Sequence, residues 1–113
     1  MMKHTIVPMK TIGLLGGMSS QATKEYYELI NEGVNKAKGE HNAAEILIYS
    51  VNFQNIERFV RNAQWEDAGM YLSEKAQQLE KGGADFLLLG TNTMHRVPHY
   101  IVEAITIPFI SII

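Results

Sequence analysis

Short runs of apolar residues alternate along this chain with longer amphipathic stretches, and this alternation constrains the fold most. Phe86–Leu89 is apolar at every position, which is typical of a strand covered on both faces. Residues 20–38 instead place apolar residues at the spacing of one helix face, namely Ala22, Tyr26, Leu29, Ile30, Gly33, Val34 and Ala37. Strands that alternate with helices predict an α/β fold with a parallel sheet between layers of helices. We expect four parallel strands in a Rossmann-like or flavodoxin-like order, with residues 11–15 and 86–89 as adjacent central strands.

The expected elements follow from these periods and from capping residues. Strands are predicted at residues 11–15, 46–51, 86–89 and 107–113, and helices at residues 20–38, 52–62, 64–81 and 94–104. Ser19 or Ser20 can cap the first helix, which Gly39 can end, and Asn52 can cap the second. Pro98 suits the last helix only if it lies in the first turn.

The length of 113 residues predicts one α/β domain, residues 11–113, after an N-terminal extension of residues 1–10. The last apolar run reaches the final residue with no polar tail, whereas chain ends usually run out into solvent. We therefore expect this chain to be the first part of a longer protein.

Composition excludes several functions. Ten basic and twelve acidic residues give a net charge of −2, which offers no electrostatic footprint for nucleic acid or anionic lipid. With no cysteine, the chain has no disulfide, thiolate nucleophile or cysteine-based metal site. No apolar run approaches the roughly 18 residues of a membrane span, and the apolar stretch after Lys10 is too short for a signal peptide. We expect a cytoplasmic protein.

Open α/β sheets bind ligands beyond the carboxyl ends of their strands, which selects three loops at residues 16–20, 52–54 and 90–93. In the first loop, two glycines allow close approach to a ligand, and the following helix N-terminus favours an anion. The loop matches neither the GxGxxG fingerprint nor a P-loop. A tight turn capped by serine explains it equally well.

The third loop carries Thr91, Asn92 and Thr93, which supply two hydroxyls and an amide at the end of a buried strand. Together with the N–H groups of the following helix, they form a suitable cradle for a carboxylate. Helix capping by Asn92 or Thr93 would need only one such residue, so three in succession favour ligand binding.

His95 and His99 lie four residues apart, the spacing of a two-histidine metal site. No third ligand accompanies them, and Pro98 disturbs the helix between them. We therefore expect no metal, and expect His95 to orient the third loop or to satisfy a polar group. His4 and His41 are expected at the surface.

Several segments together resemble the aspartate/glutamate racemase family. They are residues 12–19 (IGLLGGMS), Tyr26 and Tyr27, residues 83–85 (GAD) and residues 91–95 (TNTMH). The resemblance extends from residue 11 to residue 113 with the same order and spacing. The Gly-Gly-Met motif alone is unspecific, but its combination with Asn-Thr-x-His is specific.

The resemblance implies a pyridoxal-phosphate-independent isomerase, without a cofactor, built from two similar α/β halves with the active site between them. Such proteins are typically homodimers, and each half supplies one acid/base residue, usually cysteine. Thr91 would occupy the first catalytic position, and Asn92 and Thr93 would hold the carboxylate of aspartate or glutamate. Met18 and Ser19 would line the same site, and we add Asn52 of the second loop to the substrate-binding residues.

The chain departs from the common family pattern in two ways. Thr91 replaces the usual cysteine, as in a threonine-bearing subgroup, and the second half with its own acid/base residue is absent. A threonine hydroxyl needs a neighbour to take its proton before it can act as a base, whereas a thiolate is available near neutral pH. We therefore expect an aspartate or glutamate racemase that handles one enantiomer better than the other. The alternatives are a dicarboxylate-binding domain without catalysis and a related isomerase or lyase.

Overall fold

The computed structural model describes residues 9–90 and 97–111, which form four strands and four helices. The strands are β1 (Thr11–Gly16), β2 (Glu45–Ser50), β3 (Phe86–Leu89) and β4 (Phe109–Ser111). The helices are α1 (Ser20–Lys38), α2 (Phe53–Arg61), α3 (Trp65–Lys81) and α4 (Pro98–Ala104). The α/β class predicted from the sequence is confirmed.

The strands form one parallel sheet in the order β2-β1-β3-β4. This is the flavodoxin-like alternative of the two predicted orders. β1 and β3 are the central pair, with Ile12 opposite Phe86 and Leu15 opposite Leu89. The chain moves outward from β1 to β2 and then crosses back over β1 to reach β3. The winding direction therefore reverses between β1 and β3.

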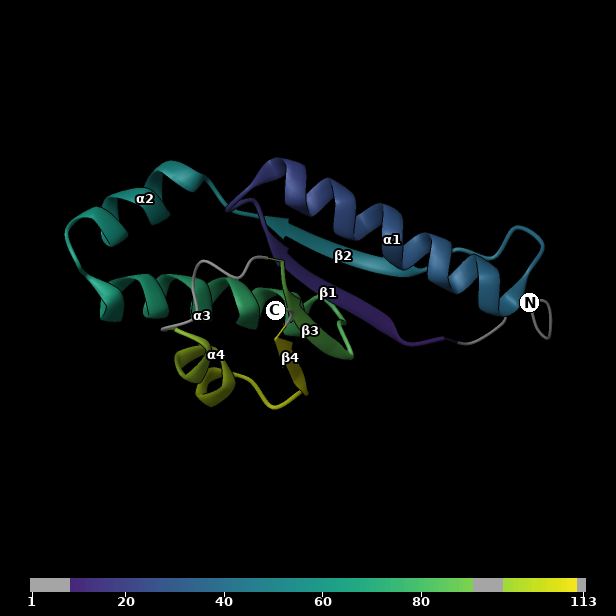
Figure 1. Cartoon of the computed structure of the whole chain (residues 1–113). Helices are drawn as coiled ribbons and strands as arrows, with labels where there is room; N and C mark the ends of the chain where they lie inside the picture. The colour runs from purple at the N-terminus through teal and green to yellow at the C-terminus, as the bar shows by residue number, and fades with distance from the viewer. Residues whose placement is uncertain (1–8, 91–96, 112–113) are drawn as a thin grey trace.

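The two faces of the sheet carry different layers of helices (Figure 1). α3 and α4 pack together on one face, and α1 lies alone on the other. The main hydrophobic core lies between the sheet and the α3–α4 layer. Its most deeply buried members are Leu15, Ile56, Ala68, Leu72, Ala76, Leu87, Leu89, Val97 and Ile101.

The α1 face is less completely covered. Leu14 and Leu88 are buried there, since side chains alternate along a strand and Leu15, Leu87 and Leu89 point the other way. Thr23 is the one buried residue of α1. The predicted apolar stripe of α1 included Leu29, which is 62% exposed. That part of the prediction is wrong because a single helix at this face leaves one flank of its stripe without a neighbour.

The element boundaries agree closely with the predictions from the sequence. Pro98 lies at the first position of α4, where its missing N–H costs nothing. The predicted start of that helix at residues 94–96 lies outside the described residues. The last strand begins at Phe109 rather than at Ile107, and its predicted end at residues 112–113 lies outside the described residues. No helix in the described part of the chain combines the length and hydrophobicity that crossing a bilayer requires.

Candidate active site at the carboxyl edge of the sheet

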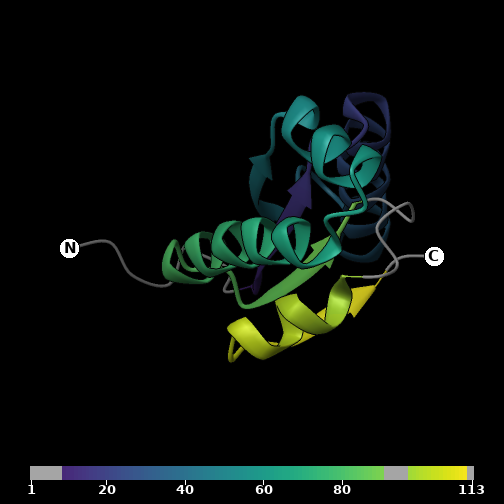
Figure 2. The ribbon, with the colours of Figure 1, turned by 90° about the vertical axis from the view of Figure 1, so that its left-hand side faces the viewer.

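The reversal of winding places the candidate site at the carboxyl ends of β1 and β3, where open α/β sheets bind their ligands. Figure 2 views the molecule from this side, with α2 beyond the ends of the strands. The Gly90 N–H donates to the Leu15 carbonyl at 2.9 Å, so β1 and β3 stay paired to the end of the shorter strand. Two of the three loops selected from the sequence therefore begin side by side.

The β1–α1 loop, defined here as residues 17–19, follows a strand end that is fixed to β2. The Val51 N–H donates to the Gly16 carbonyl at 2.9 Å. Gly17 has a φ of +90°, and a Cβ there would lie 2.4 Å from both the N and the O of Val51. Glycine is therefore required at position 17 both by its backbone conformation and by the space available.

Ser19, one of the two serines predicted as the cap, is the N-cap of α1, and its Oγ accepts the Ala22 N–H at 3.2 Å. Its side chain is exposed at the edge of the sheet. The first N–H groups of a helix point out of its N-terminus, so those of Ser20 and Gln21 are directed toward the candidate site. This end of α1 can therefore interact favourably with a carboxylate.

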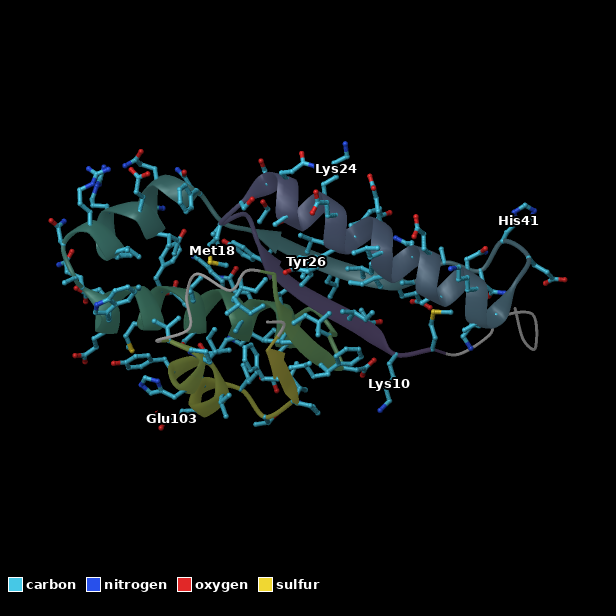
Figure 3. All side chains as sticks on the ribbon, viewed as in Figure 1. Lys10, Met18, Lys24, Tyr26, His41 and Glu103 are labelled. Carbon is cyan, nitrogen blue, oxygen red and sulfur yellow. The ribbon has the colours of Figure 1, made fainter. Side chains whose placement is uncertain are left out.

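Met18 lies in the same loop, but its side chain is only 4% exposed and belongs to the main core. Figure 3 shows it at the end of β1, on the side toward α3. Lys24, in contrast, points from α1 into solvent. The part of Met18 that faces the edge of the sheet is therefore its backbone, while the thioether helps to anchor the loop.

Asn52 is the N-cap of α2, again as predicted. Its Oδ1 accepts the Gln54 N–H at 3.0 Å, and the residue is exposed. Asn52 follows Val51 directly, and the Val51–Gly16 hydrogen bond therefore sets it beside the β1–α1 loop. Because Asn52 Oδ1 caps the helix, the Nδ2 amide group is the part of this side chain that can donate a hydrogen bond at this edge.

The third loop lies outside the described residues. The roles predicted for Thr91, Asn92, Thr93 and His95 therefore stay predictions, although Gly90 fixes where the segment begins. His99 is exposed, and its ring lies 4.0 Å from that of Tyr100. The described residues contain no group of three His, Asp or Glu side chains placed to hold a metal ion.

Two side chains that the sequence analysis did not select lie at this edge. The buried Thr23 hydroxyl accepts the Gly17 N–H at 2.9 Å and donates to the Ser19 carbonyl at 3.1 Å. Tyr26 packs toward Gly90, where an added Cβ would lie 3.3 Å from its Cδ2. Thr23 could have been found from the sequence, because it is a polar residue on the otherwise apolar inward face of the helix.

These features define an α/β protein with a candidate ligand site at the switch point of an open parallel sheet. The sequence identifies it more closely. Residues 15–113 match the Asp/Glu/Hydantoin racemase family, and the chain belongs to this family.

Two solved structures show the same fold. A crystal structure of a candidate Asp/Glu racemase from Yersinia pestis matches 89% of this chain with 40% identity and a TM-score of 0.87. The structure of an aspartate racemase homologue from Pyrococcus horikoshii matches 91% of it with 31% identity and a TM-score of 0.75. The chain spans 44% and 45% of the lengths of these two proteins, less than half of each.

Proposed function

We propose that this chain forms one half of the active site of a cofactor-independent racemase that interconverts L- and D-aspartate or glutamate. The observation that supports this most directly is the pairing of β1 with β3 at the switch point. It brings the β1–α1 loop beside Gly90, the residue that precedes Thr91. Membership of the Asp/Glu/Hydantoin racemase family supports the reaction class.

In this proposal, the substrate carboxylate binds between the N-terminus of α1 and the third loop. The amides of Ser20 and Gln21 supply the positive end of a helix, and Asn92 and Thr93 add side-chain donors. Asn52 can reach the same region from the β2–α2 connection. Hydrogen bonds to an ionised carboxylate are stronger than neutral ones, so a few well-placed donors suffice to orient the α-carbon.

Racemisation removes the α-proton on one face of the α-carbon and returns a proton on the other. We assign Thr91 to one face, where its hydroxyl donates a proton more readily than it abstracts one. The second acid/base group would come from a region comparable to the part of the two solved structures that this chain does not match. The two directions of reaction would then differ in rate. We further propose that the protein is a homodimer that acts in the cytoplasm.

The direct test follows α-proton exchange of each enantiomer in deuterated water by NMR, using the complete protein. Thr91→Ala should reduce exchange sharply while leaving substrate binding largely intact, because the methyl group neither donates nor accepts a proton. Thr91→Cys should restore a reactive thiolate and bring the two enantiomers closer in rate. Unchanged exchange by Thr91→Ala would remove Thr91 from the mechanism.

A second test separates binding from chemistry. Asn92→Ala should weaken aspartate binding by about 1–3 kcal/mol, since it removes a hydrogen bond to a charged group. Isothermal titration calorimetry measures this change. An unchanged affinity would contradict the placement of the carboxylate.

A third test uses the 113 residues alone. We expect no useful racemisation from them, because Thr91 can serve only one face of the α-carbon and the chain has no cysteine. Rapid α-proton exchange by the 113-residue chain would show that the acid/base groups are assigned wrongly. Aspartate binding without exchange by the complete protein would instead favour a binding domain.

A further inference from the structure

Thr23 is buried at the start of α1, one helical turn after the β1–α1 loop, and is 8% exposed. We propose that Thr23 is a positioning residue of the candidate site, whose hydroxyl holds the β1–α1 loop in the conformation that presents the α1 N-terminus to the substrate. This inference rests on the proposed function, because the group being positioned is the proposed carboxylate site.

The Thr23 hydroxyl forms hydrogen bonds with both ends of the β1–α1 loop. Its hydrogen is donated to the Ser19 carbonyl at 3.1 Å, and its oxygen accepts the Gly17 N–H at 2.9 Å. The Ser19 carbonyl also accepts the Thr23 backbone N–H at 3.0 Å, the first hydrogen bond of the helix. One side chain therefore ties the first residue of the loop to the last and joins both to the first turn of α1.

The surrounding backbone is shaped around this hydroxyl. A Cβ added at Gly16 would lie 2.5 Å from Thr23 Oγ1 and 2.9 Å from its Cγ2. Gly16 therefore provides the space in which the threonine side chain sits. The Gly17 N–H is buried with the hydroxyl, and a buried N–H without an acceptor is costly. Rotation of the Gly17 peptide would break this hydrogen bond and turn Gly17 away from Val51.

The position of the loop determines where the amides of Ser20 and Gln21 point, because these residues follow Ser19 directly. Ser19 is held from both ends, by its carbonyl to Thr23 and by its Oγ to Ala22. A small shift of Ser19 would move the first helical turn relative to β3. Positioning errors of about 1 Å are enough to reduce catalysis on the order of a hundredfold.

The test uses the complete protein with Thr23→Val, which keeps the branched shape and removes the hydroxyl, and Thr23→Ser, which keeps the hydroxyl and removes the methyl. Thr106→Val is the matched control. The Thr106 hydroxyl bonds to Glu80 ahead of β4, at the opposite edge of the sheet. For each variant, kcat and KM for α-proton exchange are measured well below the melting temperature, with the folded fraction determined by circular dichroism. Amide exchange of Gly17 is followed by NMR.

Thr23→Val should raise KM and lower kcat/KM by about tenfold or more, with both values calculated per mole of folded protein. Gly17 amide exchange should accelerate, Thr23→Ser should restore most of both values, and Thr106→Val should change neither. A merely structural threonine would lower the melting temperature while leaving kcat and KM per folded molecule unchanged.

The outcomes distinguish the inference from the proposed function. If the wild-type protein exchanges the α-proton of aspartate or glutamate and Thr23→Val has the same kcat and KM, the positioning role is overturned. The proposed function is then left intact. Equal losses in Thr23→Val and Thr23→Ser would also overturn the positioning role, because serine keeps the hydroxyl and its loss could not then explain the effect. Absence of wild-type α-proton exchange would overturn the proposed function itself, and the positioning role with it.

Discussion

The two faces of the sheet contribute differently to the protein. On the α3–α4 face, Leu72, Leu87 and Ile101 are completely buried in one continuous core. On the α1 face, Ile48 and Ile110 remain 41% and 50% exposed, and α1 buries only Thr23. Burial of apolar area is the main source of folding free energy, so the α3–α4 face supplies most of the stability. α1 instead contributes its N-terminus to the candidate site, and a helix can do this with few buried side chains.

Leu72→Ala should have the largest effect on stability. The side chain is fully buried in α3, and such truncations cost about 2–5 kcal/mol of unfolding free energy because they leave a cavity. Leu29→Ala, on the exposed side of α1, is the control and should change the free energy by less than about 0.5 kcal/mol. Chemical denaturation of the two variants measures the difference, and comparable losses would contradict the assignment of stability to the α3–α4 face.

Gly17→Ala should have the next largest effect. The added Cβ would collide with the Val51 backbone at a positive φ, and such overpacking costs about 1–3 kcal/mol. The control is Gly33→Ala on α1, where a Cβ meets no atom within 4 Å. That change should stabilise the protein by about 0.5–1 kcal/mol through its helix propensity. Thermal unfolding checks both, and effects of the same sign would contradict the expected contrast between the loop and the helix.

Ser19→Ala should destabilise the protein less than Leu72→Ala or Gly17→Ala, by about 1 kcal/mol, because it removes only the N-cap of α1. Asn52→Ala removes the equivalent cap of α2 and should cost a similar amount. If α1 serves the site more than the core, Ser19→Ala should weaken aspartate binding beyond its effect on stability. Calorimetric titration at a temperature where both proteins are fully folded measures the affinity. An unchanged affinity would show that the capped end of α1 does not contact the substrate.

Local patterns were enough to predict most of the fold. Phe86–Leu89 was predicted at its observed boundaries, because an uninterrupted apolar run fits a covered strand. Ser19 and Gly39 marked the ends of α1, because capping depends on side chains within a few residues of the helix end. The adjacency of β1 and β3 was also predicted, because two largely apolar strands that each precede a polar loop belong at the centre of a parallel sheet.

The site could be predicted only in part. The sequence selected the loops, but not the direction of the Met18 side chain, which depends on the sheet face toward which the loop turns. Nor did it select Thr23, because its hydrogen bond to the Gly17 N–H depends on the folded shape of the β1–α1 loop, which local sequence patterns do not encode. The exposure of Leu29 depends on how many helices share one sheet face, which periodicity within a helix does not encode.

The hydrogen bond from the Val51 N–H to the Gly16 carbonyl couples the shape of the β1–α1 loop to the docking of β2. Its two residues are separated in the chain by the whole of α1, so the loop can reach its final shape only after α1 has crossed the sheet and β2 has docked beside β1. Such non-local contacts form late, because loop closure precedes any gain from them. The β1–α1 loop is thus ordered only in molecules whose βαβ unit is complete. A carboxylate that binds the ordered loop would therefore also hold β2 in the sheet.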